Sequence, residues 1–156
     1  MALDRSKEAS PPSTRTHVVL YCRHMKKGYY ANVEDLTKAN TDFRHVLYTG
    51  KHVQLVLMTL QAGEEIGMEV HEENDQFFRF EEGLGTVIVG ETEYKVGDGD
   101  VVIVPAGTPH NVMNTGTEPL KLYTLYAPSH HKDGIVRATK QEAMDNEADF
   151  DGVTTE

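Results

Sequence analysis

The sequence has one cysteine, Cys22, no tryptophan, and no hydrophobic run long enough to span a bilayer. A single thiol cannot form an internal disulfide, and without a cysteine pair the usual thiolate zinc sites are excluded. We expect Cys22 to be inert. Basic residues are also scarce, because 15 Lys and Arg stand against 25 Asp and Glu, for a net charge of −10. Such a surface repels phosphate backbones and anionic lipid heads, so neither nucleic acid nor a membrane is an expected partner.

The chain of 156 residues has the length of one domain and is long enough to bury a hydrophobic core without a structural metal ion. A bound metal would therefore serve chemistry rather than folding. Residues 1–24 are polar at the start and lack a signal peptide, so we interpret them as a flexible extension of a cytoplasmic protein. We expect the folded domain at 25–136. The acidic tail at 137–156 should form one short helix near 139–147 and then fray.

Short β-prone runs separated by Gly, Asn, Asp or Pro fill the chain from about residue 43 to 127. Many short strands with regular turn signals predict an all-β sandwich or barrel rather than alternating strands and helices. Residues 17–22, "HVVLYC", favour an additional edge strand. Residues 32–39 favour a short helix with Asn32 as its N-cap.

Two polar stretches interrupt this pattern. In an extended segment Glu69 and His71 project to the same side, since alternate residues share a face. A simple hairpin then brings Gln76 near them. Far along the chain, a turn at residues 105–107 is followed by His110, which opens the next predicted strand.

These stretches resemble the two motifs of the cupin family. The second motif matches at every position, through Gly99, Pro105, Gly107, His110 and Asn114. The first keeps its spacing through Gly63, Glu69, His71, Gln76 and Gly83, but has Glu69 where the family usually has His and Gln76 where it usually has Glu. The resemblance implies a double-stranded β-helix, or jelly-roll barrel, with short helical or irregular arms at both ends.

The resemblance also implies one divalent metal held by Glu69, His71, Gln76 and His110. Two imidazoles, a carboxylate and an amide oxygen suit Zn, Fe, Mn, Co or Ni, whereas Cu(I) prefers sulfur. Gln76 should be the weakest ligand, and Asp75 is a rival at permitted spacing. We favour Gln76 because Gly83 follows it at the family distance.

Other residues have plainer interpretations. Met58, Phe78, Phe80 and Val112 can line a pocket wall, but barrel core is the expected place for most of them. Adjacent residues of an extended chain point apart, so His130 and His131 are not expected to chelate a metal together. We interpret them as loop or dimer-contact residues, one of which could close over the pocket.

The fold and predicted site indicate a metal-dependent enzyme acting on a small molecule. The ligand types resemble those of phosphomannose isomerases, so a sugar or sugar-phosphate isomerase activity is the first hypothesis, although no catalytic base is identified. An Fe(II) dioxygenase is the second hypothesis, because Glu69, His71 and His110 have the composition of a 2-His-1-carboxylate triad. A non-catalytic ligand-binding protein is the third. Small cupins commonly pair, so a homodimer is expected.

Overall fold

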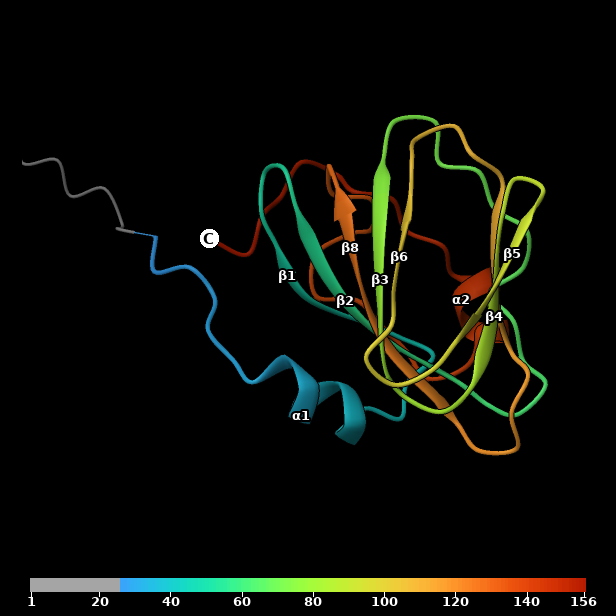
Figure 1. Cartoon of the computed structure of the whole chain (residues 1–156). Helices are drawn as coiled ribbons and strands as arrows, with labels where there is room; N and C mark the ends of the chain where they lie inside the picture. The colour runs from blue at the N-terminus through green and yellow to red at the C-terminus, as the bar shows by residue number, and fades with distance from the viewer. Residues whose placement is uncertain (1–25) are drawn as a thin grey trace, which may run out of the picture.

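The computed structural model describes residues 26–156, and two facing β-sheets make up most of it (Figure 1). The predicted strand at 17–22 and Cys22 lie outside the described residues. The helices and strands are α1 (Val33–Ala39), β1 (Arg44–Thr49), β2 (Gln54–Leu60), β3 (Asp75–Glu82), β4 (Gly85–Val89), β5 (Thr92–Val96), β6 (Val101–Val104), β7 (His110–Asn114), β8 (Leu120–Ala127), β9 (Val136–Arg137) and α2 (Lys140–Asp145).

The larger sheet has the strand order β6-β3-β8-β2-β1-β9, and the smaller has the order β5-β4-β7. Every pairing between these strands is antiparallel. Strands that are far apart in sequence lie side by side, as β3 and β8 do, and this order gives the double-stranded β-helix. The all-β fold predicted from the turn spacing is confirmed.

The core lies between the two sheets. Phe78 and Phe80 alternate along β3 and are fully buried, and Val112 faces them from the smaller sheet with no exposed surface. Met58 is also buried, so the four apolar residues considered as pocket lining belong to the core. Burying a large aromatic side chain contributes about 1.5–3 kcal/mol, so this layer is a main source of stability.

One polar row crosses the inner face of the larger sheet near one end. Gln54, Tyr126 and Gln76 are paired in register across β2, β8 and β3, and each is at most 2% exposed. Residues opposite each other in an antiparallel sheet present their side chains to the same face. The row therefore forms a buried polar floor beside the apolar core.

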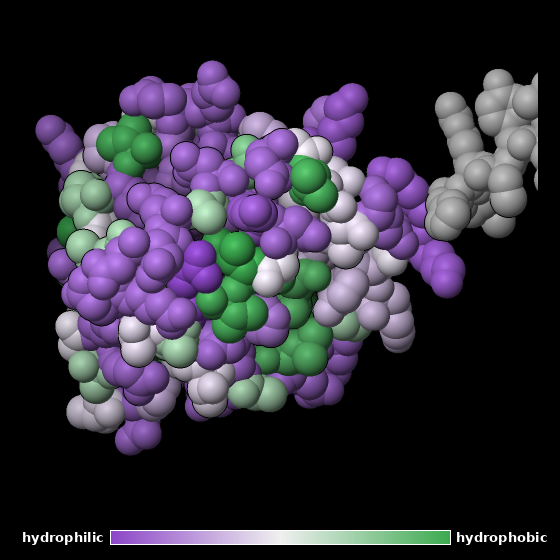
Figure 2. Space-filling view, turned by 180° about the vertical axis from the view of Figure 1, so that it is seen from behind, coloured by the Kyte–Doolittle hydropathy of each residue, from purple (hydrophilic) through white to green (hydrophobic). Residues whose placement is uncertain are grey.

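The two helices begin at polar caps. The Asn32 side chain accepts a hydrogen bond from the Asp35 amide, as predicted, and the Thr139 hydroxyl accepts one from the Glu142 amide. No helix within residues 26–156 is long and apolar enough to cross a membrane. The face seen in Figure 2 is mostly hydrophilic, with apolar side chains gathered in a central patch and a few separate spots.

The C-terminal tail departs from the prediction. The chain does not fray after α2 but returns along the barrel, where the Phe150 amide donates to the His130 carbonyl and the Thr155 amide donates to the Thr49 carbonyl. Figure 1 shows the C-terminus beside β1. The predicted fraying was wrong because these contacts join segments about twenty to a hundred residues apart, which no local pattern reveals.

Candidate metal centre

Two segments position the site through a single backbone pairing. Glu69 and His110 face each other as an isolated bridge in which each amide donates to the other residue's carbonyl at 2.9 Å. The segment carrying Glu69 and His71 thus extends the smaller sheet beyond β7, although only isolated bridges form there rather than the predicted strand. His110 is the first residue of β7, as predicted.

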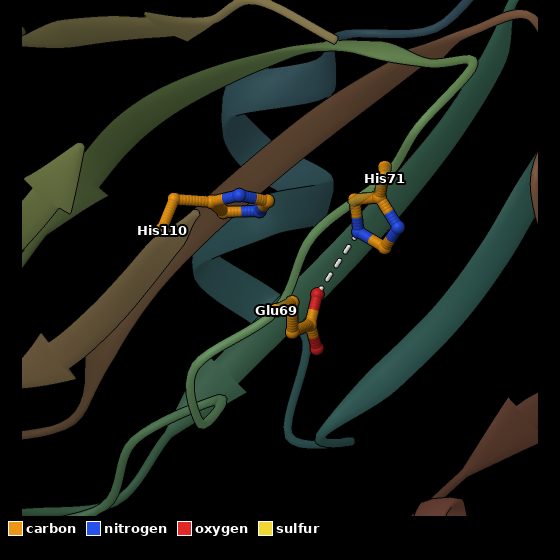
Figure 3. A group of neighbouring side chains, drawn as sticks. All are labelled: Glu69, His71 and His110. Atoms are coloured by element: carbon orange, nitrogen blue, oxygen red, sulfur yellow. Dashed lines mark hydrogen bonds and ion pairs between the residues drawn. The ribbon is translucent and has the colours of Figure 1, made fainter. Parts of the chain in front are cut away.

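The predicted acidic and imidazole residues come together. One ligand atom from each of Glu69, His71 and His110 lies within 4.8 Å of the other two. Figure 3 shows the two rings and the carboxylate turned toward a common space, with Glu69 and His71 on one segment and His110 on its neighbour. Glu69 Oε2 lies 3.0 Å from His71 Nε2, so the two residues predicted to share a face do meet.

Gln76 reaches the site from the opposite sheet. Its Oε1 lies 2.9 Å from His110 Nε2, while its Nε2 donates to the Thr124 hydroxyl at 3.1 Å. Asp75, the rival, is exposed, and its Oδ1 accepts a hydrogen bond from the Ala106 amide. Of the two, Gln76 is the residue whose oxygen faces the histidine.

The residues fit a divalent cation. His110 Nδ1 lies 3.0 Å from the Thr108 carbonyl, which can only accept, so the proton belongs on Nδ1. Burial lowers the pKa of His110 and favours the neutral ring, so in this amide orientation the lone pair of Nε2 faces the lone pairs of Gln76 Oε1. Ligand atoms about 2.1 Å from one cation lie at most about 4.2 Å apart, so a small contraction would let the triad hold it.

The charge of Glu69 is retained despite burial. Burial alone raises the pKa of this carboxyl group, but the hydrogen bond with His71 and the nearby charges of His71 and Arg44 outweigh it, and the pKa is lowered. An ionised carboxylate is the form of Glu69 that metal binding requires.

A pocket of about 330 Å³ opens next to this triad. Its lining consists of Arg44, Glu69, Val70, His71, His130, His131, Glu147 and Asp149. The volume suits a small metabolite. Apart from Val70, which lies between two of the predicted ligands, the other pocket residues come from the start of β1, from the segment after β8 and from the C-terminal tail.

The two adjacent histidines are part of this pocket. The centre of the His130 ring lies 4.3 Å from that of His71, whereas His131 is 1% exposed and packs edge-on against Tyr126. Burial lowers the pKa of His130 to about 4 and that of His131 to about 2, and it raises the pKa of Tyr126. Both histidines lie in the segment between β8 and β9, in agreement with the loop interpretation, and His131 is buried within the chain.

Sequence reasoning missed Arg44, Glu147 and Asp149. A signal existed for Arg44, since it is in phase with Val46 on β1 and both residues are buried. A basic residue in the inward phase of a strand is unusual and points to a specific environment. Glu147 and Asp149 carried no such signal within an acidic tail.

Comparison with known proteins agrees with this geometry. The sequence profile of the Cupin domain family matches residues 56–126. Protein BH2720 of Bacillus halodurans has a crystal structure that superposes with a TM-score of 0.76 at 46% identity, covering 79% of this chain and 98% of that one. The chain belongs to the cupin family.

Other cupin relatives extend the comparison. Protein YrkC of Bacillus subtilis is 47% identical over 124 residues, which cover 76% of this cupin and 67% of YrkC. A more distant match is the mannose-1-phosphate guanylyltransferase RfbM of Salmonella typhimurium, at 25% identity over 104 residues. That match covers 66% of this cupin but only 22% of RfbM, so it concerns one part of a much longer enzyme.

Proposed function

We propose that this cupin is a metal-dependent enzyme acting on a small oxygenated metabolite. The observation that carries the proposal is the cluster of Glu69, His71 and His110, with ligand atoms within 4.8 Å of one another, beside a pocket of about 330 Å³. Gln76 would complete the ligand set as its weakest member. When bound, a divalent ion such as Zn, Fe, Mn, Co or Ni would polarise a carbonyl or hydroxyl oxygen of the substrate.

A sugar or sugar-phosphate isomerase is the reaction we favour. The pocket is lined by polar side chains that can bind hydroxyl groups, and His130, Glu147 and Asp149 are side chains outside the ligand set that can take up a proton. The similarity to part of RfbM, whose name describes a sugar-phosphate enzyme, is weak support for a carbohydrate substrate.

An Fe(II) dioxygenase is the second proposal, because two histidines and one carboxylate are the ligands of non-haem iron oxygenases. The metal requirement and the oxygen requirement distinguish the two reactions. Turnover with Zn or Mn under anaerobic conditions supports the isomerase, whereas iron-dependent O₂ consumption supports the dioxygenase. Ligand affinity without turnover would identify a binding protein and contradict both.

Metal content of purified variants tests the centre. His71→Ala and His110→Ala should each lower bound metal at least about tenfold, since mutations at metal sites commonly reduce affinity by that factor or more. Glu69→Ala should also lower it, and Gln76→Ala should do so less. Glu73→Ala removes an exposed carboxylate nearby and is the matched control. Equal metal content in all five variants would refute the proposal.

We also propose that this cupin forms a homodimer. Support comes from β6, an edge strand of the larger sheet whose Val101 and Ile103 are 50% and 63% exposed. Unpaired edge strands with apolar side chains are prone to pair with another chain. Sedimentation equilibrium of the wild type and of Ile103→Lys would test this, and a monomeric wild type would contradict it.

A further inference from the structure

Arg44 is a buried cation that forms no direct ion pair with any carboxylate of residues 26–156. The residue is only 8% exposed, and its Nε is buried with no hydrogen-bond partner among residues 26–156. No ion pair within that part of the chain includes its guanidinium group. A buried charge without a partner costs several kcal/mol, so folded proteins rarely keep one unless a ligand completes the site.

The position of Arg44 identifies where that ligand would lie. Arg44 lines the 330 Å³ pocket together with Glu69 and His71, so one small molecule can contact both the guanidinium and the metal centre.

We propose that Arg44 binds the carboxylate of the substrate, and that the substrate is a small hydroxy- or keto-carboxylate whose other oxygen faces the metal centre. The proposal rests on the metal-dependent function above and adds the class of substrate. A planar guanidinium presents paired N–H donors that match the two oxygens of a carboxylate. Fixing both ends of the substrate would hold it in one orientation for reaction.

Charge balance favours a carboxylate over a phosphate ester. Three carboxylates line the pocket, on Glu69, Glu147 and Asp149, against the single cation Arg44. A divalent metal would bring the fixed charges close to neutrality, so the pocket can accept one negative charge more readily than two. A phosphate dianion would also be repelled more strongly than a carboxylate by Glu147 and Asp149 of the pocket lining.

The test compares lactate with lactamide, which differ only in the ionised group. Isothermal titration calorimetry on the Zn-loaded full chain should show lactate binding at least about tenfold more tightly than lactamide, the factor expected for a charged hydrogen-bonded pair. The preference should fall to about one in Arg44→Met. It should persist in Arg137→Met, which removes an arginine paired in register on β9 but outside the pocket.

Three binding results overturn the proposal, and one stability result does so as well. The binding results are no preference for lactate in the wild type, a preference that persists in Arg44→Met, and tighter binding of inorganic phosphate than of lactate. Unliganded Arg44→Met should also unfold at the same or a higher temperature than the wild type, because a buried charge is removed. A lower temperature would show that Arg44 is instead an ion-pair anchor for the tail. Zn content of the same samples reports on the metal proposal separately, and a carboxylate preference retained without Zn still supports Arg44.

Discussion

The buried His131 should contribute to the acid sensitivity of this cupin, and replacing His131 should remove that contribution. Desolvation, with the nearby charge of Arg44, lowers the pKa of His131 to about 2, whereas a histidine in an unfolded chain titrates near 6.5. The folded state therefore binds no proton on His131 between these values, but the unfolded state does. A depressed histidine pKa leaves stability intact above pH 6.5 and reduces it as the pH falls below that value.

The magnitude follows from linkage. Protonation of the unfolded histidine at pH 5 lowers the free energy of unfolding by about 2 kcal/mol relative to pH 7. The number hardly depends on the folded pKa, because any value below about 4 gives the same result at pH 5. With a urea m-value of about 2 kcal/mol/M, the midpoint should shift by about 1 M from this residue alone.

The assay is urea unfolding of chelator-treated protein at pH 7 and pH 5, comparing wild type with His131→Phe. Phenylalanine fills the ring volume but does not titrate. Loss of the contact between His131 Nε2 and the Tyr126 hydroxyl, at 3.3 Å, should lower stability equally at both pH values. His52→Phe changes an exposed histidine and should behave as the wild type. If His131→Phe and wild type lose the same free energy between the two pH values, the reasoning is refuted.

Two further substitutions test how the barrel supports the pocket. Gln54 is fully buried, and its amide bonds the His131 carbonyl and amide and the Thr49 hydroxyl, so Gln54→Leu should cost about 2–4 kcal/mol in urea unfolding. An unchanged midpoint would mean that water replaces these bonds. Gly83 and Gly99 both have φ of +89°, but a Cβ at Gly83 would lie 2.6 Å from a backbone oxygen, whereas at Gly99 it would meet open space. Gly83→Ala should therefore lower the melting temperature clearly more than Gly99→Ala, which carries only the strain of about 1–2 kcal/mol, and equal effects would contradict the close contact.

The features that could be predicted are those that depend on residues close together in the sequence. Period-2 alternation and turn residues predicted the strands, and the alternation of Glu69 and His71 predicted that their side chains would meet. The cap at Asn32 and the opening of β7 by His110 were also visible, because each depends on residues a few positions away.

The rest of the pocket depends on contacts that local patterns do not encode. The Gln54 side chain holds the backbone of His131 across 77 residues, and the tail returns to β1 across about a hundred. An acidic tail is typical of solvated chain, so the placement of Glu147 and Asp149 in the same pocket as Arg44 could not be inferred from composition. The sequence singles out Arg44 only because a charged residue occupies an inward-facing position of β1, where an apolar residue is usual.

The geometry of the site links ligand binding to the integrity of the barrel. Glu69 and His110 are fixed by one backbone pairing on the smaller sheet, whereas Gln76 belongs to the larger sheet and contacts His110 across the interior. A cation held by this set would therefore join both sheets. Because such a ligand binds only the folded state, its binding free energy would add to the free energy of unfolding. At acid pH the proton would compete for the same imidazoles, so metal release and protonation of the unfolded His131 would destabilise this cupin over the same pH range.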